Sequence, residues 1–141
     1  MNRSCIFCKI VLGEIPSIKI AETTKSYAFM DIAPTAKGHV VIIPKYHGEK
    51  LHNLPDEHLA DLLPLAKKIA IASKLDISGL DGEGYNLLQN NGSIAHQVVP
   101  HVHFHLIPKR SEDTGLQVGW PQPKLSESLE EIAAEITKNL A

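Results

Sequence analysis

Three histidines alternate with apolar residues between positions 101 and 105. In an extended chain, successive side chains point to opposite faces, so His101, His103 and His105 share one surface while Val102 and Phe104 enter the core. Three of the chain's eight histidines at strict period two are hard to obtain by chance on a solvated strand face. Because an unperturbed imidazole has a pKa of roughly 6.5, it is largely neutral and nucleophilic near neutral pH. We therefore predict a catalytic surface here.

The only two cysteines, Cys5 and Cys8, are separated by two residues. The opening residues Met1-Asn2-Arg3-Ser4 show no secretory signal, so we expect a cytoplasmic chain and leave a nuclear share open. In a reducing compartment a stabilising disulfide is the weaker interpretation. Metal or redox chemistry is the stronger one.

Composition indicates an ordinary globular chain. Its 141 residues suit a single domain, with a core over about 5–110 and an extension with a helix over 111–141. The formal charge of -2 argues against a nucleic-acid partner, which would need a net basic surface. No apolar stretch approaches the roughly 20 residues that span a bilayer, so no membrane partner is expected.

Periodicity predicts the elements that must position these side chains. Strands are predicted over 18–22, 27–31, 39–43, 85–89 and 102–107. The β-branched run 39–43 is the expected central strand, buried on both faces. Helices are predicted over 6–12, 55–75 and 129–140, with a loop over 79–84. Within the long helix, Pro64 predicts a kink or a later start, and Ser128 with Glu131 is spaced as a capping box. The predicted fold class is α+β.

The segment from His101 to Ile107 resembles the signature of the histidine triad (HIT) superfamily of nucleotidyl hydrolases and transferases. Similarity is closest to its histidine triad nucleotide-binding branch, especially fungal adenosine 5'-monophosphoramidases. Further matches follow in family order: Cys5-Ile6-Phe7-Cys8-Lys9-Ile10, Gly13-Glu14-Ile15-Pro16, Phe29-Met30-Asp31-Ile32, Gly38-His39, Ile43-Pro44-Lys45-Tyr46-His47, Asn90-Asn91-Gly92, Gln97 and Gly119-Trp120-Pro121.

The resemblance implies a fold and an assembly. The HIT fold is a five-stranded antiparallel sheet with one long helix and a C-terminal helix, and two sheets join across a homodimer. Trp120 resembles a tryptophan that lies near the partner's active site in this branch. A simple interface anchor is an almost equal interpretation for it.

The resemblance also implies catalytic roles. His103 would attack the phosphorus, which splits hydrolysis into two displacements through a nucleotidyl-histidine. The backbone carbonyl of His101 would accept a hydrogen bond from the other nitrogen of His103. His105 would approach the scissile phosphate, either as an imidazolium that stabilises charge or as a proton donor to the leaving group.

For an AMP-type purine nucleotide, the family positions fall in the N-terminal half and before the triad. Asp31 would accept hydrogen bonds from the ribose, and Asn90 and Gln97 would orient the phosphate. Val98 stands where many relatives have a Ser or Thr hydroxyl, which leaves only its backbone N–H as a donor. The residues that would flank the base or the pocket are Phe7, Ile10, Ile15, Phe29, Ile32 and His39.

Relatives with the two cysteines recruit ligands at positions that match His47 and His101. Together with Cys5 and Cys8 these would form a closed tetrahedral set, which suits a structural zinc. In relatives without the cysteines, the histidine at the first of these positions is merely hydrogen-bonded to the second. We expect zinc as the cofactor.

Three functions follow from the resemblance. The first is hydrolysis of the P–N bond in adenosine 5'-monophosphoramidate or AMP-lysine-type compounds. The second is cleavage of diadenosine polyphosphates, which a sister branch performs with the same histidine. The third, of a different class, is a nucleotide-responsive binding or scaffold protein whose turnover is incidental.

Overall fold

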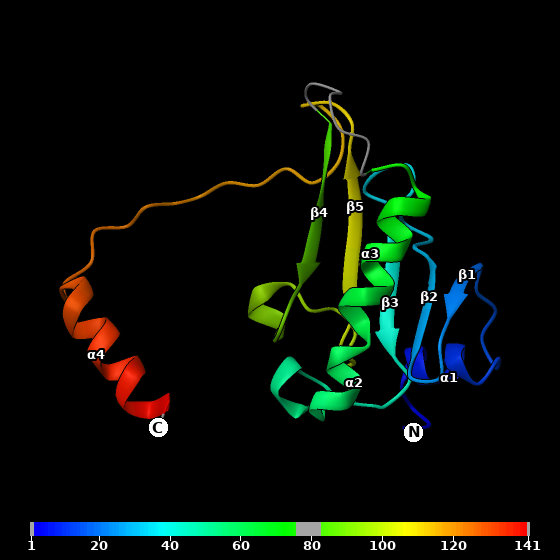
Figure 1. Ribbon diagram of the computed structural model, residues 1–141, viewed down its shortest axis with the longest axis horizontal. Coiled ribbons are helices and arrows are strands. Elements are labelled where there is room, and N and C mark those ends of the chain that lie inside the picture. The colour runs from blue at the N-terminus through cyan, green and yellow to red at the C-terminus, as the bar shows by residue number, and fades with distance from the viewer. Residues whose placement is uncertain (1, 76–82, 141) are drawn as a thin grey trace.

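The protein is described from a computed structural model that covers residues 2–75 and 83–140. Five antiparallel strands form one sheet in the order β1-β2-β3-β5-β4 (Figure 1). The strands are β1 (Lys19–Glu22), β2 (Ser26–Met30), β3 (Val40–Pro44), β4 (Gly84–Gln89) and β5 (Phe104–Lys109). All five predicted strands are therefore confirmed, and β3 is central and buried throughout, as its β-branched run predicted.

Helices lie on both faces of the sheet. They are α1 (Ile6–Val11), α2 (Asp56–Ala60), α3 (Leu62–Ala72) and α4 (Leu129–Leu140), with short 3-10 turns at Leu51–Asn53 and Ser93–Ala95. On one face, α3 buries Leu62, Leu65 and Ile69 against alternate residues of the sheet. On the other face, α1 buries Phe7 and Ile10. The strand residues that point to α1 therefore form the floor of the site.

The long predicted helix is divided in two. Residues 56–60 and 62–72 form separate helices, and Pro64 lies in the first turn of α3, where its missing N–H breaks no helical hydrogen bond. The helical stretch thus begins near its predicted start and is interrupted before Pro64, and only the part that contains Pro64 starts later. Most of the predicted loop over 79–84 lies outside the described residues. Its last residue, Gly84, is already the first residue of β4.

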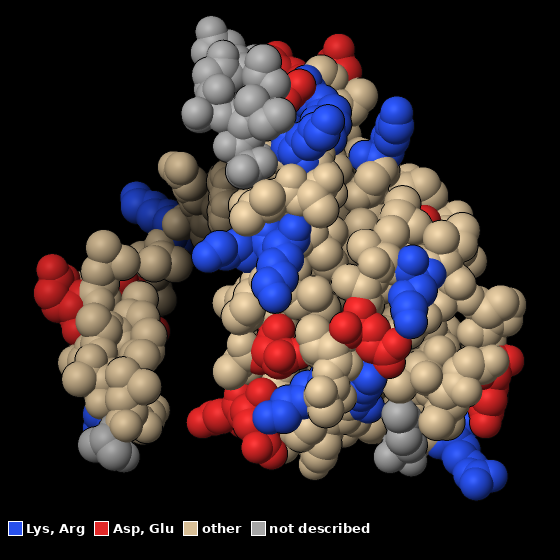
Figure 2. All heavy atoms as spheres, turned by 45° about the vertical axis from the view of Figure 1, so that its right-hand side comes forward, with Lys and Arg blue, Asp and Glu red and all other residues tan. Residues whose placement is uncertain are grey.

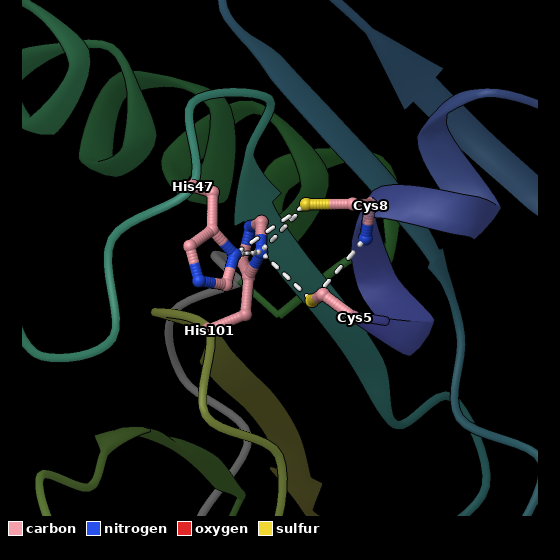
Figure 3. A group of neighbouring side chains, drawn as sticks. All are labelled: Cys5, Cys8, His47 and His101. Atoms are coloured by element: carbon pink, nitrogen blue, oxygen red, sulfur yellow. Dashed lines mark hydrogen bonds between the residues drawn. The ribbon is translucent and has the colours of Figure 1, made fainter. Parts of the chain in front are cut away.

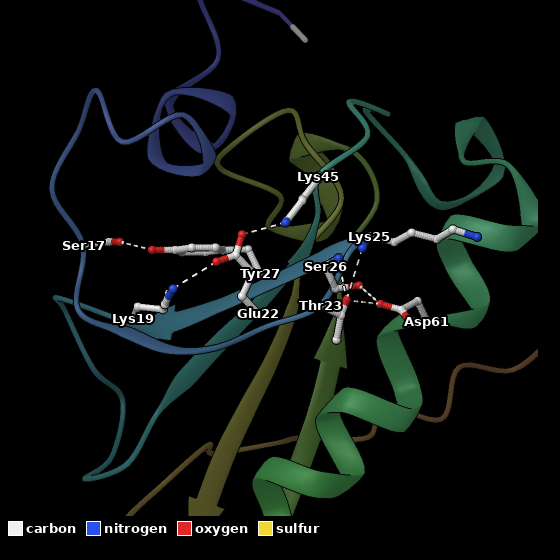
Figure 4. A network of polar contacts seen from close by, with 9 residues as sticks. All are labelled: Ser17, Lys19, Glu22, Thr23, Lys25, Ser26, Tyr27, Lys45 and Asp61. Carbon is white, nitrogen blue, oxygen red and sulfur yellow. Dashed lines mark hydrogen bonds and ion pairs between the residues drawn. The ribbon is translucent and has the colours of Figure 1, made fainter.

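Asp61, between the two helices, fastens them to the β1–β2 hairpin. Its carboxylate accepts hydrogen bonds from the hydroxyls of Thr23 and Ser26 (Figure 4). These contacts lower the pKa of Asp61, with the Ser26 hydrogen bond as the largest cause. Ser26 is fully buried, so its hydroxyl needs this acceptor. The hairpin that leads to β2, and hence to Asp31, is held at its tip.

The C-terminal arm leaves the sheet at the end of β5 and carries α4 away from the body (Figure 1). The N–H of Glu131 donates to the Ser128 hydroxyl at 3.1 Å, which is one half of the predicted capping box. None of the residues of α4 is buried, although Leu129, Ile136 and Leu140 are apolar. Among the described residues, α4 therefore buries no apolar side chain against the rest of the chain.

Acidic and basic side chains are interspersed on the face drawn in Figure 2. This mixture agrees with the small net charge of the sequence. Among the described residues, no helix combines the length and the apolar character that a bilayer crossing requires.

Candidate active site

The histidine triad lies where the chain enters β5. The strand begins at Phe104, two residues later than the predicted start at Val102. His101 and His103 therefore precede it. The alternation of faces nevertheless holds, because Val102 joins the core beneath α3 while the histidines point to the α1 side. The surface that the histidines were predicted to share is not an open one, since His101 and His103 are 0% and 4% exposed. Helix α1 and the loops before β5 cover them.

His101 belongs to a group of four side chains that point toward one another (Figure 3). The start of α1 supplies Cys5 and Cys8, and the segment after β3 supplies His47. Nε2–H of His101 donates to the Pro44 carbonyl at 2.8 Å, so its Nδ1 keeps a free lone pair toward the cluster. Burial lowers the pKa of His101 to about 4, which keeps the ring neutral.

The spacing of this cluster fits a tetrahedral zinc. Ordinary bond lengths place two nitrogen ligands about 3.3 Å apart, and a nitrogen and a sulfur about 3.6 Å apart. Here Nδ1 of His47 lies 3.2 Å from Nδ1 of His101. The Sγ atoms of Cys5 and Cys8 lie 3.4 Å and 3.6 Å from Nδ1 of His101. Burial raises the pKa of the Cys8 thiol, so its thiolate needs a nearby cation.

The ring of His103 is held with one nitrogen unprotonated. Its Nδ1–H donates to the His101 carbonyl at 2.7 Å, which leaves the lone pair on Nε2. The Phe7 ring packs edge to face on the imidazole, with ring centroids 5.1 Å apart. Burial lowers the pKa of His103, so the ring is neutral near neutral pH. This is the arrangement that a histidine nucleophile requires.

His105 contacts His39 and approaches Asp31. Nδ1 of His105 lies 2.9 Å from Nε2 of His39 and 4.0 Å from Oδ2 of Asp31. Burial, together with His103 and His39, lowers the pKa of His105 to about 4. Near neutral pH the ring is therefore neutral, and the imidazolium expected from the resemblance is not its stable form.

Asp31, His39 and His105 are close enough together to suggest a second metal site. The backbone N–H of Thr35 argues against it, because it donates to Nδ1 of His39 at 3.0 Å. A neutral ring that accepts at Nδ1 carries its proton on Nε2, the nitrogen that faces the cluster. That nitrogen therefore offers no lone pair to a metal ion.

A pocket of about 430 Å³ opens in front of His103 and His105. Its wall is mostly apolar, and Asp31 is the one carboxylate among the described residues that line it. Ile32 and Val98 in this wall are 93% and 88% exposed, so they offer apolar surface to a bound ligand. The predicted residues found in the wall are Phe7, Ile10, Ile15, Phe29, Asp31, Ile32, Val98, His103 and His105.

Asn90, Gln97 and His39 are not part of that wall. The Gln97 side chain is buried and already occupied, because it accepts from the Gly92 N–H and donates to the Val99 carbonyl. Asn90 Nδ2 donates to the His96 carbonyl at 3.4 Å. These side chains hold the loop before the triad, while His39 lies behind His105.

His96 lines the pocket, a position for which no motif in the sequence selects it. It adopts the left-handed conformation, with φ 69°, which is uncommon for residues other than glycine. Neither its spacing nor its neighbours in the sequence indicate this position. Other wall residues that the sequence analysis missed are Ile6, Pro16, Ser17, Met30, Ala33, Val41 and Val99.

A neutral, buried histidine that an antiparallel sheet presents to an apolar pocket suits a small nucleotide hydrolase, and similarity to known proteins supports this class. The HIT domain family model matches residues 12–112. Adenosine 5'-monophosphoramidase HNT1 of Candida albicans is 59% identical, over 96% of this chain and 95% of its own length. Its namesake from Saccharomyces cerevisiae is 63% identical over 86% of this chain and 72% of its own.

Solved structures extend the similarity to the fold. A histidine triad nucleotide-binding protein from Candida albicans superposes with a TM-score of 0.91 at 57% identity, over 96% of both chains. A HIT family protein from Bacillus subtilis has a TM-score of 0.87 at 37% identity, over 99% of both chains. This chain belongs to the HIT family.

Proposed function

We propose that this protein hydrolyses the P–N bond of adenosine 5'-monophosphoramidate or AMP-lysine-type compounds. The observation that carries the proposal is the unprotonated Nε2 of a neutral His103, which lies at the end of an apolar pocket that contains Asp31. The names of the relatives support the choice of substrate, because the fungal proteins above are adenosine 5'-monophosphoramidases.

Catalysis would proceed in two displacements at phosphorus. In the first, Nε2 of His103 forms a bond to phosphorus as the P–N bond breaks, and the departing amine takes up a proton. In the second, water attacks the nucleotidyl-histidine, releases AMP and loses a proton. One water is consumed and the protons balance. The His101 carbonyl holds the Nδ1–H of His103 throughout, so the ring keeps its orientation.

Nucleotide recognition would use the rest of the wall. Oδ1 of Asp31 accepts a hydrogen bond from the Ala33 N–H at 2.8 Å, and Oδ2, which lies 3.4 Å from Nε2 of His39, would accept hydrogen bonds from ribose hydroxyls. Phe7, Phe29 and Ile32 provide apolar surface for a purine.

The function is tested by side-by-side turnover of an adenosine phosphoramidate and a diadenosine polyphosphate, with His103→Ala as the control. We expect the phosphoramidate to have the higher kcat/KM and the control to be inactive. Preference for the dinucleotide would assign the protein to the sister activity. Tight AMP binding without turnover of either substrate would indicate the scaffold function.

The cysteine and histidine cluster would hold one structural zinc. Cys5, Cys8, His47 and His101 would be its four ligands, which leaves no open position for a reactive water. The ion would supply a cross-link between α1 and the segment that carries His101, whose carbonyl orients His103. The tetrahedral spacing of the ligand atoms supports this proposal.

A homodimer would join two sheets through β4. The other edge strand, β1, is short, irregular in register and charged, which are features that discourage pairing. By contrast β4 has six residues and exposes Tyr85 and Leu87. Analytical ultracentrifugation should find a dimer that Leu87→Lys weakens. A parent protein that stays monomeric at micromolar concentration would contradict this assembly.

A further inference from the structure

The loop before the triad holds His96 in an uncommon conformation at the pocket. Its backbone is left-handed, with φ 69°, and the loop is fixed on both sides of it. The buried Gln97 donates to the Glu49 carbonyl at 2.6 Å and accepts from the Gly92 N–H at 2.7 Å. The Asn90 amide donates to the carbonyl of His96 itself at 3.4 Å. Strain that such contacts maintain at a pocket is typical of a side chain with a function.

The ring of His96 differs from the other two imidazoles in the pocket wall by its exposure. His103 is buried and His105 is half-buried, whereas His96 is exposed. Within the described part of the chain, His96 makes its hydrogen bonds through its backbone alone, so the ring is available to a ligand. Water stabilises the charge of an exposed imidazolium, and the anionic phosphate of a nucleotide favours it further. His96 can therefore bring a proton into the pocket.

Hydrolysis of a P–N bond needs an acid. When the bond breaks, its electron pair stays on nitrogen, and an amine leaves only if that nitrogen gains a proton. Among the described residues, no lysine or arginine lines the pocket, and the titratable side chains of its wall are Asp31, His96, His103 and His105. The proton must come from one of these four groups or from water.

Three of the four groups are poor sources of that proton. Nε2 of His103 forms the bond to phosphorus, and Asp31 is the proposed acceptor for ribose hydroxyls. Burial, together with His103 and His39, lowers the pKa of His105 to about 4, so this ring is neutral near neutral pH. A neutral ring has no excess proton to give. His96 is the remaining group.

We propose that His96, as an imidazolium, protonates the departing amine. The inference rests on the proposed function, because that amine is the leaving group of a phosphoramidate. In the first displacement, Nε2 of His103 forms its bond to phosphorus, the P–N bond breaks, and the nitrogen keeps the electron pair of that bond and takes the proton of His96. In the second, water attacks phosphorus, the bond to His103 breaks, and neutral His96 takes up a proton from the water. The ring of His96 thus ends each turnover as it began.

The test compares two substrates that differ in their need for a proton. An adenosine phosphoramidate releases an amine, whereas adenosine 5'-(4-nitrophenyl phosphate) releases a stabilised phenolate that leaves without one. His96→Asn and His96→Gly remove the imidazole, and both new residues adopt the left-handed conformation readily, so we expect both proteins to fold. His52→Asn is the matched control, because His52 is exposed on the turn at Leu51–Asn53 and does not line the pocket.

With the phosphoramidate, kcat/KM should fall about 100-fold in both His96 variants, which is a usual contribution of a general acid. With the nitrophenyl ester, kcat/KM of the same variants should stay within about threefold of the parent. His52→Asn should match the parent on both substrates.

Equal losses on the two substrates would overturn the proposal, since His96 would then bind the nucleotide and not protonate the leaving group. Folded variants that keep the parent's kcat/KM on the phosphoramidate would overturn it as well. A parent that cleaves the ester and not the phosphoramidate would refute the proposed function, and the role of His96 would fall with it. The activity of the parent therefore separates the two failures.

Discussion

Asp31 lines the pocket, and one of its two carboxylate oxygens accepts a hydrogen bond from the backbone. Because Oδ1 is held by the Ala33 N–H, Asp31→Asn keeps that contact and removes the charge that faces both the pocket and His39. We expect about tenfold weaker binding of AMP and a smaller loss for its 2',3'-dideoxy analogue, measured by calorimetry. Asp113→Asn, on an exposed loop, is the control. Equal losses for both ligands would show that Asp31 supports the loop and not the sugar.

His96 is held in a strained conformation at the pocket. The left-handed region costs a residue with a side chain about 1 kcal/mol relative to glycine, so His96→Gly should raise the free energy of unfolding by about that amount. Strain that persists at a pocket indicates a functional side chain, and we expect kcat/KM to fall in the same variant. Urea denaturation and steady-state kinetics would measure the two effects. If stability and kcat/KM rise together, His96 is only a turn residue.

The sequence predicted the side chains of the site better than their surroundings. Strict alternation placed the triad histidines correctly on one side of the chain, because the period of an extended backbone depends only on local geometry. Their burial was missed, since it depends on α1, which is distant in the sequence. The tautomer of His39 depends on Thr35, whose backbone N–H has no signature in the sequence.

At the level of elements, the proposed zinc would fasten α1 to the catalytic segment. We predict one zinc per chain and a lower melting temperature after chelation, because an ion that binds only the folded form stabilises it. Elemental analysis of untagged protein and thermal denaturation would test this. In the Cys5→Ser, Cys8→Ser double variant, zinc should be absent and the chelator should have no effect. A parent without zinc, and as stable as the double variant, would leave the cysteines as packing residues.

Element boundaries were hardest to predict around prolines. The last strand was predicted to end at residue 107, just before Pro108, yet β5 continues to Lys109. Pairing with β3 stops at Leu106, so beyond it only β4 is a neighbour and the missing N–H of Pro108 need not break a hydrogen bond. Strand order decides whether a proline is tolerated, and the local sequence does not encode strand order.

The whole molecule should lose stability on acidification, in part through His105. Its pKa is about 4 when folded and roughly 6.5 when unfolded, so between these values the unfolded chain binds more protons. The native state is therefore favoured above about pH 6.5 and weakened as the pH falls toward 4. Between about pH 7 and pH 5 the parent should lose about 2 kcal/mol more than His105→Asn, as measured by urea denaturation. Equal losses in the two proteins would contradict the burial of a neutral His105.

Covalent catalysis by His103 is tested most directly by mass spectrometry of protein quenched during turnover of an adenosine phosphoramidate. The expected result is an AMP adduct on the peptide that contains His103, formed as fast as the amine is released. His103→Ala should form no adduct and lose several kcal/mol of transition-state stabilisation, of the order expected for a covalent catalyst, while still binding AMP. An adduct on another residue, or residual activity of His103→Ala within about tenfold of the parent, would remove His103 from the nucleophile role.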